Sequence, residues 1–146
     1  MNTAHRAEVL IQLIAEAVHR SIYQGALELS RGEGGILMYL CFVHDGATSG
    51  ELSEQLAVGS GRIANALKVL EGKGMIVRRC AERDRRRVIV NLTDEGRRFA
   101  CGRRLELCQK TERLLSEMGE PDASDFLRLL ERAVLLAKRL ERSDWE

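Results

Sequence analysis

Arginine residues gather in one short stretch of the sequence. Residues 61–104 hold 13 Lys and Arg against 5 Asp and Glu, a net charge of +8, whereas the remainder of the chain carries −7. Such a local excess of positive charge favours a surface that binds a polyanion. A solvated arginine-rich face is the alternative interpretation. The residues at the centre of this stretch are Arg78, Arg79, Arg83, Asp84, Arg85, Arg86 and Arg87.

A second group of polar residues lies upstream, on a helix predicted over Arg62–Glu71. Arg can bind guanine O6 and N7, and Asn can bind adenine N6 and N7, each through two hydrogen bonds. Residues 62 and 65 are three positions apart and therefore share a helix face. Contact with phosphate alone remains an alternative for Arg62. The candidate base-reading residues are Ser60, Arg62, Asn65 and Lys68.

The elements around these residues predict a winged helix. Thr48–Glu51 has the pattern of a capping box and begins a short helix that ends near Leu56. A tight connection at 58–61 leads to the second helix, which Gly72–Gly74 ends. Two short strands, Met75–Cys80 and Val88–Leu92, then flank a polar turn. A helix-turn-helix followed by two strands with a basic tip describes a winged helix.

Further helices are predicted on both sides of this centre. An amphipathic helix covers Ala7–Tyr23, and a Ser30–Glu33 capping box precedes a buried helix over Ile36–Val43. Thr93 caps a long helix that ends near Met118, where Gly119 and Pro121 break it, and a last helix runs over Asp125–Leu140.

The terminal helices predict self-association. Their leucine-, isoleucine- and valine-rich stripes would be exposed in a monomer, so we expect a twofold homodimer that buries them. The expected organisation is an N-terminal dimerisation helix at 1–30, a winged helix-turn-helix DNA-binding domain at 31–97 and C-terminal dimerisation helices at 98–146. The fold class is mainly α with a small β wing.

Composition excludes several broad classes. A chain of 146 residues with 45% hydrophobic and 31% charged residues is expected to fold as one domain. Aromatic residues make up 4% and there is a single proline, which favours helices over strands. The longest apolar run, Ile36–Val43, is much shorter than a membrane span, and the N-terminus has no signal pattern. We therefore expect a cytoplasmic protein.

Three segments in this order resemble the MarR family of winged-helix transcriptional regulators. They are Gly50–Leu56, Leu67–Arg79 and Asp84–Gly96, and the last is similar to the Asp-x-Arg wing signature with its following Leu-Thr and acidic pair. The resemblance implies a dimeric DNA-binding regulator, usually a repressor, on a near-palindromic operator. It also implies that a small molecule or an oxidant, acting between the dimer base and the winged helices, changes the spacing of the recognition helices.

The resemblance assigns roles in the wing as well. Arg86 is the candidate for insertion into a narrow minor groove, where negative potential is concentrated. Asp84 would position it, or would instead be a turn residue that accepts backbone amides. Arg83, Arg85 and Arg87 are expected to contact phosphates or to stay solvated.

The chain departs from the family pattern at the start of the second helix. Gly59, Gly61 and Arg62 stand where members often have Ser or Thr. In this interpretation Ser60 caps the helix, and much of the specificity for the DNA sequence comes from DNA shape.

Other functions fit the residues less well. Gly59–Ala64 matches the dinucleotide-binding fingerprint, but a helix rather than a buried strand is predicted before it, so we expect neither an enzyme nor a cofactor. A winged helix that binds a protein partner instead of DNA is the rival function. Its interface would be depleted in charge, which the arginine-rich wing tip argues against.

The cysteines and histidines give no clear site. Cys41, Cys80, Cys101 and Cys108 lack Cys-x-x-Cys spacing and are expected to be small buried residues, with redox sensing left open. His44 has too few potential ligands around it for zinc, so no metal is expected.

Overall fold

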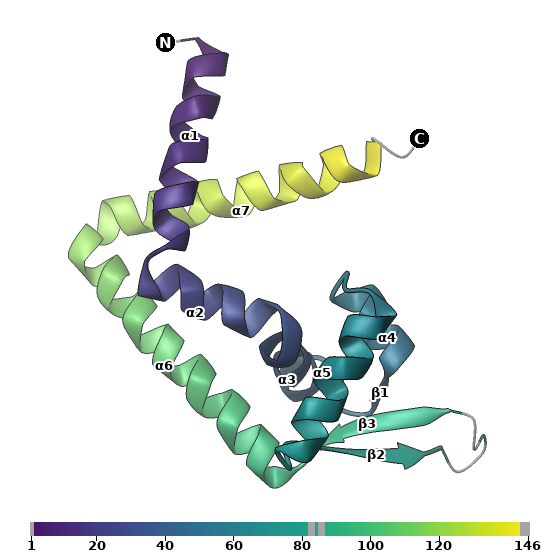
Figure 1. Ribbon diagram of the computed structural model, residues 1–146. Helices are drawn as coiled ribbons and strands as arrows, with labels where there is room; N and C mark the ends of the chain where they lie inside the picture. The colour runs from purple at the N-terminus through teal and green to yellow at the C-terminus, as the bar shows by residue number, and fades with distance from the viewer. Residues whose placement is uncertain (1, 82–83, 85–86, 144–146) are drawn as a thin grey trace. The chain divides into compact units, whose positions relative to one another are not determined.

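The computed structural model describes residues 2–81, 84 and 87–143 (Figure 1). The chain forms two compact units, Met1–Leu107 and Cys108–Glu146. Helix α6 (Asp94–Met118) begins in the first unit and ends in the second, which also contains α7 (Glu120–Ser143). The other elements all belong to the first unit: α1 (Thr3–Val18), α2 (Ser21–Ser30), α3 (Gly32–Phe42), β1 (Ala47–Thr48), α4 (Ser49–Gln55), α5 (Ser60–Gly72), β2 (Ile76–Cys80) and β3 (Val88–Leu92).

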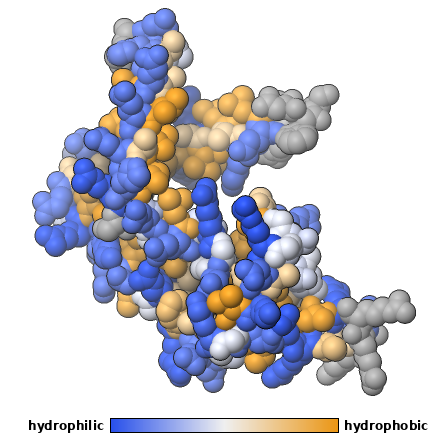
Figure 2. Space-filling model, in the orientation of Figure 1, coloured by the Kyte–Doolittle hydropathy of each residue, from blue (hydrophilic) through white to orange (hydrophobic). Residues whose placement is uncertain are grey.

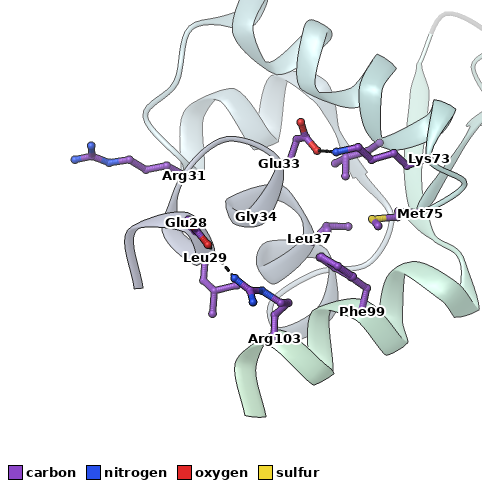
Figure 3. A pocket seen from close by; sticks show the side chains of 11 residues that line it. Glu28, Leu29, Arg31, Glu33, Gly34, Leu37, Lys73, Met75, Phe99 and Arg103 are labelled. Atoms are coloured by element: carbon purple, nitrogen blue, oxygen red, sulfur yellow. Dashed lines mark hydrogen bonds and ion pairs between the residues drawn. The ribbon is translucent and has the colours of Figure 1, made fainter. Parts of the chain in front are cut away.

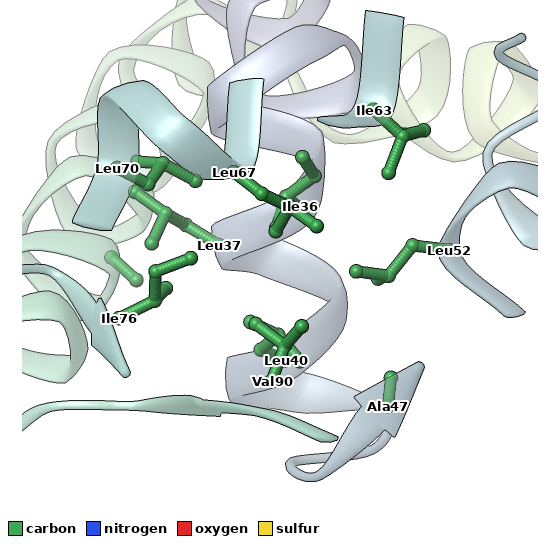
Figure 4. Packing of buried hydrophobic residues seen from close by; sticks show 11 residues of the cluster. Ile36, Leu37, Leu40, Ala47, Leu52, Ile63, Leu67, Leu70, Ile76 and Val90 are labelled. Atoms are coloured by element: carbon green, nitrogen blue, oxygen red, sulfur yellow. The ribbon is translucent and has the colours of Figure 1, made fainter. Parts of the chain in front are cut away.

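The core of the first unit is aliphatic. Helix α3 lies at its centre, and side chains of α4, α5 and the sheet point toward it (Figure 4). Each fully buried Leu or Ile side chain stabilises the fold by about 1.5–3 kcal/mol relative to leaving it in water. This cluster therefore fixes the helix-turn-helix and the strands as one body. Its members are Ile36, Leu37, Leu40, Ala47, Leu52, Ile63, Leu67, Leu70, Ile76, Val90 and Ala100.

The sheet has three antiparallel strands in the order β1-β3-β2. Strands β2 and β3 pair from Ile76 opposite Leu92 to Cys80 opposite Val88, as the predicted hairpin requires. The two-residue strand β1 pairs Ala47 with Val90 and was not predicted, because its residues alone carry no strand signal. The winged-helix fold class predicted from the sequence is confirmed.

Two glycines allow backbones to approach closely. A Cβ atom on Gly34 would lie 1.9 Å from the Glu28 carbonyl oxygen, and one on Gly96 would lie 2.0 Å from the Met75 carbonyl oxygen. Any side chain at these positions would separate α3 from α2, or the start of α6 from the segment between α5 and β2.

The helix boundaries differ from the prediction at the N-terminal side. The helix expected over Ala7–Tyr23 is two helices, because Arg20 has an extended backbone between α1 and α2. The predicted cap by Ser30 is wrong as well. Its hydroxyl donates to the Leu27 carbonyl oxygen at 3.0 Å within α2, and Arg31 is the N-cap of α3 without a side-chain bond.

The last helix begins earlier than predicted, at Glu120 rather than Asp125. Gly119, with φ of +79°, separates α6 from α7. Pro121 lies in the first turn of α7, where a missing N–H costs nothing because that group has no intrahelical acceptor. In the described part of the chain, none of the helices combines the length and apolar character needed to cross a bilayer.

Candidate nucleic-acid interface

Helices α4 and α5 form the predicted helix-turn-helix. The Thr48 hydroxyl caps α4 by accepting a hydrogen bond from the Glu51 backbone N–H at 3.2 Å. The turn is closed by the Ser53 hydroxyl, which donates to the Val58 carbonyl oxygen at 2.6 Å. Ala57 in this turn has φ of +51°, a left-handed conformation that non-glycine residues rarely adopt. The turn sets the direction in which α5 leaves α4.

Helix α5 has one buried and one exposed face. Ile63, Leu67 and Leu70 are buried, at 0–2% exposure. The four candidate base-reading residues are all exposed and alternate with this apolar stripe, as the sequence predicts. Among the described residues, neither cation of this group takes part in an ion pair, so both are available to a ligand. The group is Ser60, Arg62, Asn65 and Lys68.

The start of α5 differs from the expectation that Ser60 caps it. Gly59 is the N-cap and makes no side-chain bond, and Ser60 is the first helical residue. The carbonyl oxygen of Gly59 accepts from the N–H groups of Arg62 and Ile63 at 3.0 and 3.1 Å. Glycine is tolerated at an N-cap, so the cap lies one residue before the expected position.

The β2–β3 hairpin carries the remaining candidates. Arg79 and Arg87 are exposed. Asp84 is exposed too, and its carbonyl oxygen accepts the Arg87 N–H at 2.9 Å in the turn. Arg83, Arg85 and Arg86 lie outside the described residues. The hairpin therefore presents at least two guanidinium groups beside the helix-turn-helix.

Arg78 differs from the other arginines because it is paired within the fold. Its Nε donates to Glu71 Oε2 at 3.0 Å, and its Nη2 binds the same oxygen. These bonds lower the pKa of the Glu71 carboxyl and raise the pKa of the Arg78 guanidinium. The pair joins β2 to the end of α5, so Arg78 fixes the hairpin relative to the recognition helix.

The structure adds Asp45, a residue that the sequence patterns did not single out. The Asp45 carboxylate accepts from the Leu92 backbone N–H at 2.9 Å through one oxygen and from Arg97 Nη2 at 2.6 Å through the other. It therefore connects the loop before β1 with the end of β3 and the start of α6. Its partners lie 47 and 52 positions away, so no local pattern could have predicted them.

A second network orders the segment between α3 and α4. Glu51 Oε1 accepts from the Tyr39 hydroxyl and contacts His44 Nδ1, both at 2.8 Å. The bond with His44, followed by that with Tyr39, lowers the pKa of the Glu51 carboxyl, and the bond to Glu51 raises the pKa of Tyr39. In the described part of the chain, no three His, Cys, Asp or Glu side chains are grouped to hold a metal ion.

The segment Gly59–Ala64 does not have the surroundings of a dinucleotide-binding turn. It follows helix α4, whereas a dinucleotide-binding turn requires a buried strand at that place.

The prediction that the cysteines are buried is wrong, because Cys80, Cys101 and Cys108 are exposed and Cys41 is partly buried. Cys101 follows the buried Ala100, and the step of about 100° per residue around a helix turns it away from the core.

Comparison with known proteins agrees with the fold. A model of the winged helix DNA-binding domain family matches residues 34–109. A Bacillus subtilis (strain 168) protein named uncharacterized HTH-type transcriptional regulator YdgJ is 30% identical over 131 residues, which are 87% of this chain and 75% of that protein. The organic hydroperoxide resistance transcriptional regulator of the same strain is 34% identical over 61 residues, 42% of each protein.

Solved structures share the architecture over nearly the whole chain. Streptococcus pneumoniae FabT in complex with DNA superposes with a TM-score of 0.74 at 20% identity, covering 95% of this chain and 99% of that one. A MarR family protein from Bacillus stearothermophilus also gives 0.74 at 20% identity, covering 94% and 99%. The chain therefore belongs to the winged-helix DNA-binding family, as its resemblance to MarR regulators predicted, and it is a DNA-binding transcriptional regulator with the MarR fold.

Proposed function

We propose that the chain binds a near-palindromic operator as a homodimer and represses transcription. The observation that carries this proposal is the exposed polar face of α5 beside a hairpin with exposed arginines. In the proposal residues 31–97 bind DNA, whereas residues 1–30 and 98–146 provide the contacts between two copies.

Helix α5 is suited to the major groove. Recognition helices present their N-terminal residues to base edges, and the first turns of α5 carry Arg62 and Asn65 on one exposed face. We assign base contacts to these two residues, and contacts at the rim of the groove to Ser60 and Lys68. With few long side chains on this face, DNA shape supplies part of the specificity.

The hairpin is assigned to the neighbouring backbone and minor groove. Arg79 and Arg87 are exposed and suited to phosphate contacts. The sequence adds three further arginines to this hairpin, Arg83, Arg85 and Arg86. We assign Arg86 to insertion into the minor groove and Asp84 to positioning it. Arg78 contributes indirectly, since its bond to Glu71 holds the hairpin against α5.

Both terminal regions expose apolar side chains that a second copy would cover. On α1, Leu10, Ile11, Leu13 and Ile14 are 54–67% exposed, and α7 exposes Leu127 to Leu140 at several positions of its apolar stripe. Figure 2 shows hydrophobic side chains at the surface along both helices. Exposed stripes of this kind usually mark an interface, and a twofold dimer matches the symmetry of a palindrome. A monomer in sedimentation at micromolar concentration would refute this part.

A cavity in the first unit is our candidate for the site of a small-molecule signal. It has a volume of about 430 Å³ and lies among α2, α3, the end of α5 and α6. Leu29, Leu37 and Phe99 line it with apolar surface. Two ion pairs border it, Glu28 with Arg103 at 2.9 Å and Glu33 with Lys73 at 2.6 Å (Figure 3). This combination suits a small molecule with an apolar body and a polar end.

Such an effector would act by linkage. The cavity adjoins Lys73, which directly follows the recognition helix, so a ligand that displaces the Glu33–Lys73 pair would alter how α5 is held. If a compound lowers operator affinity, operator DNA must lower the affinity for that compound by the same factor. A compound that binds without changing operator affinity is not the effector.

Selection of bound duplexes from a random DNA pool tests the proposal most directly. We expect an inverted repeat with half-sites about one helical turn, roughly 10 base pairs, apart. Recovery of single, unpaired half-sites would contradict the dimer. Absence of preference for any duplex over competitor, even at low salt, would overturn DNA recognition and favour the protein-interaction module.

A further inference from the structure

Two cysteines distant in sequence lie close together in the first unit. Cys41 on α3 and Cys101 on α6 are 60 positions apart, yet their Sγ atoms are 3.7 Å from each other. Both are free thiols. Because a disulfide bond is about 2.05 Å long, the two sulfur atoms would have to approach by less than about 2 Å to form one.

Contacts on either side hold the two helices at this separation. Arg97, one turn before Cys101, binds Asp45 just beyond the end of α3 at 2.6 Å. Arg104, about one turn after Cys101, places its guanidinium carbon 4.2 Å from the centre of the Phe42 ring. Residues 97, 101 and 104 share one face of α6. These two contacts hold α6 beside the end of α3, on either side of the position where the two sulfur atoms approach each other.

The two thiols have different surroundings. Cys101 is exposed, whereas Cys41 is partly buried. Burial raises the pKa of the Cys41 thiol and the adjacent Cys101 thiol adds to the rise, while Arg97 opposes it. An oxidant from solution therefore meets Cys101 first, and Cys41 is placed to react with the product.

We propose that Cys41 and Cys101 are a modification site at which a hydroperoxide forms a reversible intrachain disulfide. The Cys101 sulfur attacks the peroxide O–O bond, becomes a sulfenic acid and releases the corresponding alcohol, or water when the oxidant is hydrogen peroxide. The Cys41 sulfur then attacks the Cys101 sulfur, forms the S–S bond and expels the hydroxyl group as water. In total two thiols are oxidised by two electrons and the peroxide bond is reduced.

The bridge would tie α3 to the first turns of α6, next to the bonds through which Asp45 holds the end of β3. Its formation does not depend on DNA binding, so the chemistry can be tested even if the proposed operator function fails. A dithiol reductant would reverse it by thiol–disulfide exchange.

The test uses the full chain with Cys80→Ser and Cys108→Ser, which leaves only the proposed pair. After treatment with hydrogen peroxide under native conditions, we expect both thiols to be lost and the chain to run as a single polypeptide on a non-reducing gel. Peptide mapping should link the Cys41 and Cys101 peptides, and dithiothreitol should restore both thiols. Two remaining thiols, a link between two copies, or oxidation to sulfinic acid without a link would each overturn the proposal.

Single variants test the order of the two steps. With Cys41→Ser added, the sulfenic acid on Cys101 should persist and be trapped by dimedone. With Cys101→Ser added instead, Cys41 should give little or no adduct under the same treatment. The control is Cys41→Ser with Cys101→Ser in the otherwise natural chain, which should form no intrachain bridge. Equal trapping of the two cysteines would contradict the assignment of Cys101 as the first site of attack.

Discussion

Arg97 Nη2 donates a hydrogen bond to Asp45 Oδ2 at 2.6 Å, and this ion pair joins α6 to the loop before β1. The other oxygen of Asp45 accepts from the Leu92 backbone N–H, so one carboxylate fixes both the end of β3 and the start of α6. Asp45, which lies in the loop between α3 and β1, thereby links the end of β3 to α6, the helix that leads into the second unit.

Replacement of Asp45 should destabilise the first unit. Asp45→Ala removes the acceptor of the Leu92 N–H and the partner of Arg97, and we expect a loss of about 1–2 kcal/mol, limited because the ion pair is partly exposed to solvent. Asp45→Asn keeps an acceptor oxygen and should cost less. Urea unfolding measures both variants, and equal losses would show that the charge, not the backbone bond, carries the effect.

Arg62→Ala should weaken binding to the selected operator. If Arg62 reads a base, we expect a loss of about 1–3 kcal/mol, roughly tenfold or more, together with relaxed preference at one operator position. Contact with phosphate alone would instead weaken binding to all sequences equally. It would also reduce the slope of log affinity against log salt concentration by about one. Fluorescence anisotropy against operator and scrambled duplexes separates the two cases.

Arg86→Ala should lower operator affinity without unfolding the protein, since its proposed role is insertion into the minor groove. Arg87→Ala removes an equal charge from an exposed phosphate-type position and should have the smaller effect. Both variants should keep the steep fall of affinity with salt that counterion release requires. Unchanged affinity of Arg86→Ala at moderate salt, measured beside an unchanged thermal melt, would remove Arg86 from the interface.

Stability should fall at acidic pH partly through Glu51. Its bonds with His44 and Tyr39 lower the pKa of its carboxyl in the folded chain. The stabilisation is therefore complete above the unfolded pKa of about 4.3 and is lost as the pH falls through the lower folded value. Thermal melts of Glu51→Gln should differ from the unmodified chain at neutral pH and converge with it in acid. Glu54→Gln, an exposed neighbour, should show no such convergence.

The turn between α4 and α5 should accept glycine at position 57. Ala57 has φ of +51°, which costs an L-residue roughly 1–2 kcal/mol, although glycine adds freedom to the unfolded chain. We expect Ala57→Gly to be neutral or to stabilise by up to about 1 kcal/mol. Ala64→Gly, at an exposed position inside α5, should instead destabilise by about 1 kcal/mol. Similar losses for both variants in urea unfolding would contradict the strain at Ala57.

Much of the fold follows from signals that act within a few residues. The Thr48 cap, the stop at Gly72–Gly74 and the alternation of Val88–Leu92 each bias the chain locally, and the predicted elements form there. The candidate residues on α5 were predictable for the same reason, because helical spacing alone separates Arg62 and Asn65 from the buried Ile63.

The remaining features depend on contacts between separate elements. Four of them exist only when separate elements pack together. They are the Asp45–Arg97 pair, the Arg78–Glu71 pair, strand β1 and the approach of Cys41 to Cys101. The sequence by itself determined the helix-turn-helix, the β2–β3 hairpin and which polar face of α5 stays exposed, since these depend on spacing and capping. Only the tertiary structure decided which arginine is held within the fold and which thiols meet, because packing of the aliphatic core sets those distances.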